Sequence, residues 1–127
     1  ELVDASLSKN LKKTQEILNE NNYAHEDTFF ILRVFLQKAK KILSLLEKIE
    51  NKSDIEKVIS EHRPPIFWKD KPVIKKQLEL WSYKKMSNLI QKLNHIEITI
   101  KKNNTLSIIL MKNFIYEMLD QKISSSS

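Results

Sequence analysis

The stretch DTFFILRVFLQKAKKILSLLEKI, residues 27–49, decides the fold class. Its apolar residues recur at the spacing that places side chains on one face of an α-helix. We expect a long helix that Asp27 or Thr28 opens and that ends near Ile49. Because the apolar stripe is wide, this helix should have neighbours on more than one side.

The segments around this stretch show the same helical periodicity. Upstream, we expect a short helix over residues 2–8 and a second over residues 11–20, with the Asn10 side chain as its N-cap. Downstream, Ser53 and Glu56 have the spacing of a capping box, which predicts the start of another short helix.

Prolines and small polar residues mark the remaining helix boundaries. Pro64 and Pro65 must end the short helix, because proline lacks the amide donor and forces the preceding residue out of the helical region. Pro72 suits the first turn of the next helix, and Ser82 and Thr105 suit the N-caps of the last two. The final helix is apolar on several faces, which predicts a central position in the fold.

The composition also favours helices. The chain has 127 residues, of which 41% are hydrophobic and 30% charged, and these values suit one globular domain. It contains no glycine, so tight hairpin turns are awkward to build. We therefore expect an all-α domain, a compact bundle of about five to seven helices, over residues 1–123. The serine run at residues 124–127 should be a disordered tail.

Missing residue types exclude several kinds of site. Without glycine the chain has neither a Walker A loop nor a dinucleotide-binding fingerprint. Without cysteine it has no disulfide and no thiolate metal site, which agrees with a cytoplasmic location. No apolar run is long enough to cross a bilayer, so we expect no membrane contact. The three histidines are scattered, and no strained glycine turn presents a serine nucleophile. We expect no catalytic residue, no cofactor and no metal.

Positive charge suggests two functions. The net charge is +6, and five lysine pairs, among them Lys40-Lys41 and Lys101-Lys102, are spread along the chain. Such a surface attracts nucleic acid through counterion release, which would make the chain an autonomous basic helical module that binds nucleic acid. Alternatively, the lysines only keep the helices soluble, because acidic residues are interspersed among them.

Composition does not explain residues 63–72, RPPIFWKDKP. Phe67 and Trp68 lie there in a loop between prolines, where exposure to water is unfavourable. Either both rings are buried and fasten the loop to the core, or they form a surface for a partner protein, where aromatic residues and arginine concentrate.

A family resemblance begins at the same loop. RPPIFWK at 63–69, Lys71-Pro72, Gln77-Leu78 and Leu80-Trp81-Ser82 resemble the C-terminal part of the delta subunit of the bacterial DNA polymerase III clamp loader, most closely its alphaproteobacterial form. Residues 2–7, 29–35 and 93–101 are similar to further helices of that domain, so the resemblance covers nearly the whole chain.

The resemblance implies a clamp-loader collar domain of the post-AAA+ oligomerisation type. Such a domain is non-catalytic and scaffolds the complex that loads the sliding clamp in DNA replication. Its partners would be the gamma/tau and delta-prime subunits, with weak contact to primed DNA. The chain begins at Glu1 without methionine, so we expect it to be cut from a longer polypeptide whose missing N-terminal domain contacts the clamp.

The resemblance and the loop together give two sets of candidate residues. The interface candidates are Phe30, Arg33, Arg63, Phe67 and Trp68. The collar loop between the last two helices can lie near the primed template in that family, and the residues at this position are Lys101, Lys102, Asn103 and Asn104.

Overall fold

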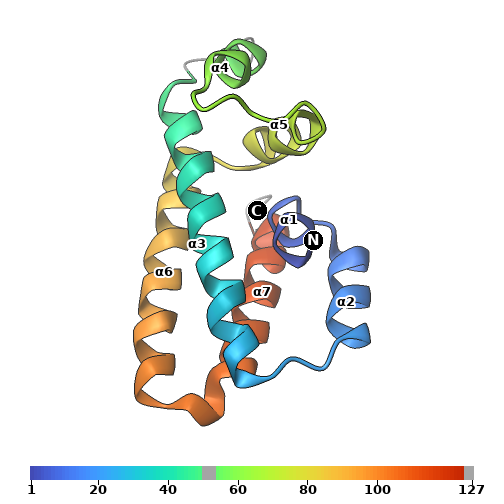
Figure 1. Ribbon diagram of the computed structural model, residues 1–127, viewed down its shortest axis with the longest axis vertical. Helices are drawn as coiled ribbons and strands as arrows, with labels where there is room; N and C mark the ends of the chain where they lie inside the picture. The colour runs from blue at the N-terminus through green and yellow to red at the C-terminus, as the bar shows by residue number, and fades with distance from the viewer. Residues whose placement is uncertain (50–53, 125–127) are drawn as a thin grey trace.

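Seven α-helices build the part of the chain that the computed structural model describes, residues 1–49 and 54–124 (Figure 1). In chain order they are α1 (Leu2–Leu7), α2 (Leu11–Glu20), α3 (His25–Glu47), α4 (Ile55–Glu61), α5 (Lys71–Leu80), α6 (Tyr83–Lys102) and α7 (Ser107–Ser124), with the 3₁₀ helix η2 (Asn104–Leu106) before α7. No strand occurs in these ranges. The prediction of an all-α fold is therefore confirmed for them.

Three long helices form the frame of the fold. α3 and α6 pack against each other in antiparallel directions, and α7 turns back beside them (Figure 1). α1 packs on α3 and α7, while α2 lies outside α1. α4 and α5 lie together at the end of the molecule where α3 ends and α6 begins (Figure 1).

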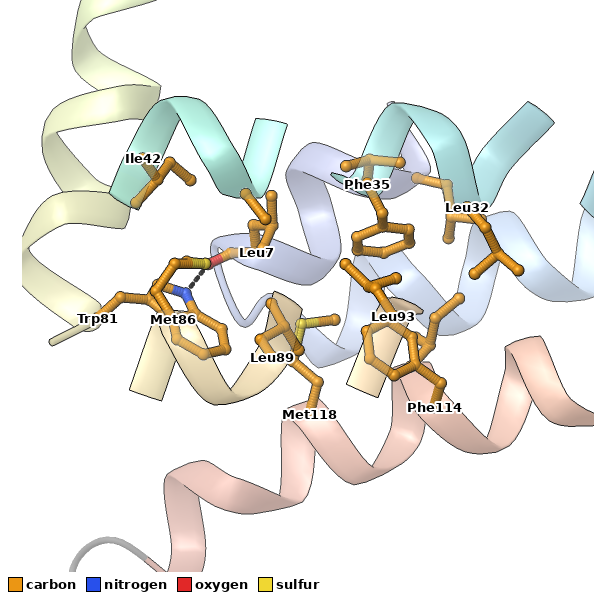
Figure 2. Close-up of a cluster of buried hydrophobic side chains, with 14 of the residues drawn as sticks. Leu7, Leu32, Phe35, Ile42, Trp81, Met86, Leu89, Leu93, Phe114 and Met118 are labelled. Carbon is orange, nitrogen blue, oxygen red and sulfur yellow. Dashed lines mark hydrogen bonds between the residues drawn. The ribbon is translucent and has the colours of Figure 1, made fainter. Parts of the chain in front are cut away.

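The core lies where α1, α3, α6 and α7 meet (Figure 2). The Phe35 ring of α3 meets the Phe114 ring of α7 edge-on, with ring centroids 5.6 Å apart. Each fully buried side chain of this kind contributes roughly 1.5–3 kcal/mol to stability. On α3 the buried residues keep the helical spacing expected from the sequence: Thr28, Leu32, Phe35, Ala39, Ile42 and Leu45. α7 buries Met111, Phe114, Ile115, Met118 and Leu119, in line with its expected central position.

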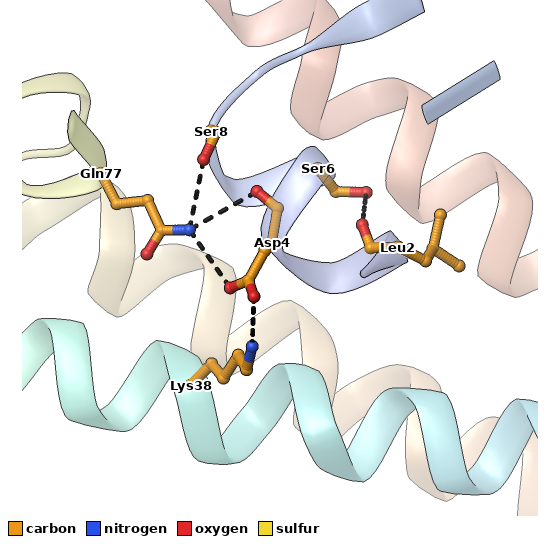
Figure 3. A network of polar contacts seen from close by, with 6 residues as sticks. All are labelled: Leu2, Asp4, Ser6, Ser8, Lys38 and Gln77. Atoms are coloured by element: carbon orange, nitrogen blue, oxygen red, sulfur yellow. Dashed lines mark hydrogen bonds and ion pairs between the residues drawn. The ribbon is translucent and has the colours of Figure 1, made fainter. Parts of the chain in front are cut away.

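Polar contacts orient α1 against α3 and α5 (Figure 3). Lys38 Nζ donates to Asp4 Oδ2 at 2.6 Å, and Gln77 Nε2 donates to Ser8 Oγ at 3.3 Å. The Lys38 and Asp4 side chains are about two-fifths exposed, so their ion pair adds little stability of its own. The network fixes the orientation of α1 more than it strengthens the fold.

Two predicted N-caps are confirmed, Pro72 lies in the first turn of α5 as expected, and two other helix starts differ. The Asn10 and Ser82 side chains each accept a hydrogen bond of 3.1 Å from the amide three residues on, as predicted for N-caps. α3 begins at His25, earlier than expected, because Asp27 Oδ2 accepts the Ala24 amide at 2.9 Å and so lies inside the first turn. Thr105 does not cap α7.

At the start of α7 the chain first forms η2. Thr105 lies within η2, where its hydroxyl donates to Asn103 Oδ1 at 2.7 Å, and α7 begins at Ser107. α4 begins at Ile55 after Asp54, and Ser53 of the predicted capping box lies outside the described residues. Of the expected serine tail, Ser124 ends α7 and residues 125–127 lie outside the described residues.

Candidate partner-binding surface

The loop between α4 and α5, residues 62–70, buries one apolar side chain and exposes two. Ile66 is 6% exposed and belongs to the core. Phe67 and Trp68 are 56% and 68% exposed. Of the two expectations for these rings, burial in the core is therefore wrong, and both rings lie on the surface.

Local contacts hold the loop in shape. The Asp70 amide donates to the Phe67 carbonyl at 2.9 Å, which closes a turn around the exposed rings. His62 Nδ1 lies 2.8 Å from the Pro64 carbonyl oxygen. Together with the buried Ile66 side chain, these contacts fix the loop before any partner binds, which lowers the entropy that binding must remove.

The two exposed rings pack against each other. The Phe67 and Trp68 centroids are 5.9 Å apart with the ring planes tilted by 49°. The Lys69 ammonium lies 5.5 Å from the Trp68 centroid, in cation–π range. The two rings thus form one apolar surface, and the Lys69 ammonium lies over the Trp68 ring.

An ion pair ties the two helices beside the loop. Lys75 Nζ of α5 donates to Glu56 Oε1 of α4 at 2.8 Å. The hydrogen bond and charge of Lys75 lower the pKa of Glu56, and those of Glu56 raise the pKa of Lys75. Both residues of the pair line an open groove, together with Ile59, Lys71 and Pro72. Lys71 follows directly after the loop, so the groove begins beside it.

The structure separates the predicted interface residues into two patches. Arg63, Phe67 and Trp68 belong to the α4–α5 loop, whose last residue, Asp70, shares a small cavity with the second half of α3. Phe30 and Arg33 lie one turn apart on the exposed face near the start of α3, at the other end of that helix (Figure 1). They cannot contribute to the same small contact area as the loop.

The predicted DNA-proximal residues lie at the end of the molecule away from the α4–α5 loop (Figure 1). Lys101 and Lys102 form the last turn of α6, Asn103 follows it as the C-cap, and Asn104 begins η2. Lys101 Nζ lies 3.7 Å from Glu97, which offsets part of its charge. The turn from 101 to 105 contains no aromatic residue on which a base could stack.

Two residues beside the aromatic pair, Lys69 in the loop and Lys71 at the start of α5, were not among the predicted interface residues. Both side chains are exposed, and the Lys69 ammonium lies over the Trp68 ring, so Lys69 would contact a partner that covers Trp68. Their adjacency to the aromatic pair in the sequence was the available signal. The sequence alone could not show that the two rings face solvent. The lysines become candidates for partner contact only because the rings are exposed.

A cavity of about 90 Å³ is lined by Asp4, Lys38 and Gln77 among others, whose polar groups already bond to one another. Within residues 1–49 and 54–124, no three histidine, aspartate or glutamate side chains gather as they would around a metal ion. None of the helices in these ranges combines the length and apolar content of a membrane span.

Comparison of the chain with protein-family models, with curated proteins and with solved structures finds no match.

Proposed function

We propose that this chain is a non-catalytic oligomerisation domain, the collar domain of a clamp-loader delta subunit, which joins other subunits of the DNA polymerase III complex. The observation that carries the proposal is the exposure of Phe67 and Trp68. These rings lie in the segment, residues 63–82, whose sequence most resembles that family. An exposed aromatic pair on a loop of fixed shape is typical of a surface that a partner protein covers.

The energetics support a contact made mainly by these two rings. A Phe or Trp side chain buries about 150–250 Å² when it is covered. At about 25 cal/mol per Å² of apolar surface, covering the exposed parts of both rings contributes several kcal/mol. That is sufficient for the two residues to dominate a subunit contact.

Co-purification tests the proposal. The chain is mixed with the gamma and delta-prime subunits of the same organism, and complex formation is measured by size-exclusion chromatography. We expect the wild type to join the complex and the Phe67→Ala plus Trp68→Ala variant to lose binding at least about 100-fold, since two central aromatic contacts are removed.

A matched control comes from the other end of the molecule. Ile98→Ala plus Ile109→Ala removes two side chains that are 55% and 57% exposed, close to the exposure of Phe67. This variant should bind as the wild type does. Failure of the wild-type chain to bind either subunit would contradict the proposal.

The alternative, an autonomous nucleic-acid-binding module, rests on the net charge of +6. It predicts that the chain alone binds primed DNA with an affinity that falls steeply with salt concentration. We expect only weak binding in that assay, because no aromatic residue accompanies the lysines of the turn from 101 to 105.

A further inference from the structure

Positive charge borders the exposed aromatic pair. Arg63 precedes Phe67 and Trp68 in the loop, Lys69 and Lys71 follow them, and all three basic side chains are exposed. Arg63 Nη1 donates to the main-chain carbonyls of His62 at 3.0 Å and Ser60 at 3.4 Å, at the end of α4. None of the three cations forms an ion pair with another residue in the described ranges.

Two lysines on the adjacent helices differ in this respect. Lys75 pairs with Glu56 at 2.8 Å and Lys38 pairs with Asp4 at 2.6 Å. Between residues 62 and 72 Asp70 is the only acidic residue, and it lies toward α3, beside the cavity that Lys38 and Asp4 line. The loop therefore presents cations whose charge is left without a counterpart in the described part of the chain.

From this arrangement we infer that the loop binds an acidic protein surface, in which an apolar pocket receives Phe67 and Trp68 and carboxylates at its edge meet Arg63, Lys69 and Lys71. This inference rests on the proposed function and adds the chemistry of the partner. Charges at the edge of an interface guide encounter and select the partner, while the buried rings supply most of the affinity.

A protein surface fits the ring geometry better than single-stranded nucleic acid does. Bases stack on flat aromatic faces that are open to them. Here the Phe67 and Trp68 planes are tilted by 49° against each other, and the Lys69 ammonium lies over the Trp68 ring. The pair resembles a wedge suited to a pocket more than a platform for successive bases.

The test measures the dissociation constant of the whole 127-residue chain for the gamma and delta-prime subunits at about 50 and about 300 mM salt. We expect the wild type to bind about tenfold more weakly at high salt. Arg63→Gln plus Lys69→Gln plus Lys71→Gln should bind about tenfold more weakly at low salt and respond to salt less than about threefold. Lys12→Gln plus Lys40→Gln plus Lys92→Gln, which removes three exposed charges elsewhere, should behave as the wild type.

Four other outcomes would each overturn the inference. Equal weakening by both triple variants would show that only net charge matters and would overturn the inference. If Phe67→Ala plus Trp68→Ala abolishes binding while the first triple variant binds as the wild type does, the acidic partner is overturned and the proposed function stands. If the wild type binds neither subunit, both fail together. Binding of single-stranded oligothymidylate that Trp68→Ala abolishes would overturn the inference in favour of nucleic acid.

Discussion

The indole N–H of Trp81 donates a 2.8 Å hydrogen bond to the main-chain carbonyl oxygen of Leu7, which fastens the end of α5 to the last residue of α1 (Figure 2). Both residues are buried. Trp81→Phe removes the donor and leaves a buried carbonyl unpaired, so we expect a loss of about 1–3 kcal/mol in the free energy of unfolding. Urea denaturation measures the loss.

Trp68→Phe is the control for this substitution, because it makes the same chemical change on the surface. It should alter the free energy of unfolding by less than about 0.5 kcal/mol. Equal losses in the two variants would contradict the role of the Trp81 hydrogen bond.

Lys9 takes the left-handed conformation that usually belongs to glycine, with φ of 55°. The Lys9 amide donates to the Ser6 carbonyl, and the Asn10 amide donates to the Ala5 carbonyl, both at 3.0 Å. These two hydrogen bonds form the Schellman motif that ends α1. The Lys9 ammonium also lies 4.6 Å from the Trp81 ring centroid. Both Lys9→Gly and Lys9→Ala lose that contact, but only glycine relieves the backbone. We expect the glycine variant to be more stable than the alanine variant by about 1 kcal/mol in urea denaturation, and the reverse order would contradict this account.

Local signals were enough to predict much of the fold. The helical period of residues 27–49 predicted α3 and its buried face, and Asn10 and Ser82 marked two helix starts. These features depend on residues within one turn of each other, so the sequence contains all that is needed. The start of α3 was misplaced because Asp27 suits both the N-cap and the third helical position, and the choice depends on which amide its carboxylate accepts.

Contacts between segments that are distant in the chain could not be predicted from the sequence. Ile66, Phe67 and Trp68 are consecutive apolar residues, yet only the first is buried. Which of them enters the core depends on where α4 and α5 place the loop, and no local pattern fixes that placement. The hydrogen bond from Trp81 to Leu7 likewise joins residues whose proximity appears only after the helices pack.

The Glu56–Lys75 ion pair should give a measurable shift in titration. Lys75 lowers the pKa of Glu56, so the stabilisation from this carboxylate is present above its unfolded pKa and is lost as pH falls through the folded one. Lys75→Gln should raise the pKa of Glu56 toward its ordinary value, as carbon NMR of the side-chain carboxyl would show. Lys76→Gln, an exposed neighbour, should leave it unchanged, and an unchanged pKa in both variants would contradict the pairing.

The α4–α5 loop should separate stability from binding. Ile66→Ala removes a core side chain and should lower the free energy of unfolding by about 2–5 kcal/mol. Phe67→Ala plus Trp68→Ala should lower it by less than about 1 kcal/mol, because both rings are exposed. Thermal denaturation by circular dichroism compares the two. A large loss in the double variant would show that the rings support the fold.

Fluorescence can follow the two tryptophans separately, since Trp68 is 68% exposed and Trp81 is 3% exposed. In Trp68→Phe the remaining Trp81 should emit at shorter wavelength and resist quenching by acrylamide, because its indole lies in the core. In Trp81→Phe the remaining Trp68 should emit at longer wavelength and be quenched readily. Under the proposed function, adding the gamma and delta-prime subunits to the second variant should protect Trp68 from acrylamide, because a partner that covers the ring excludes the quencher. If the subunits bind and the quenching of Trp68 does not change, the contact lies elsewhere, and the patch of Phe30 and Arg33 becomes the next surface to test.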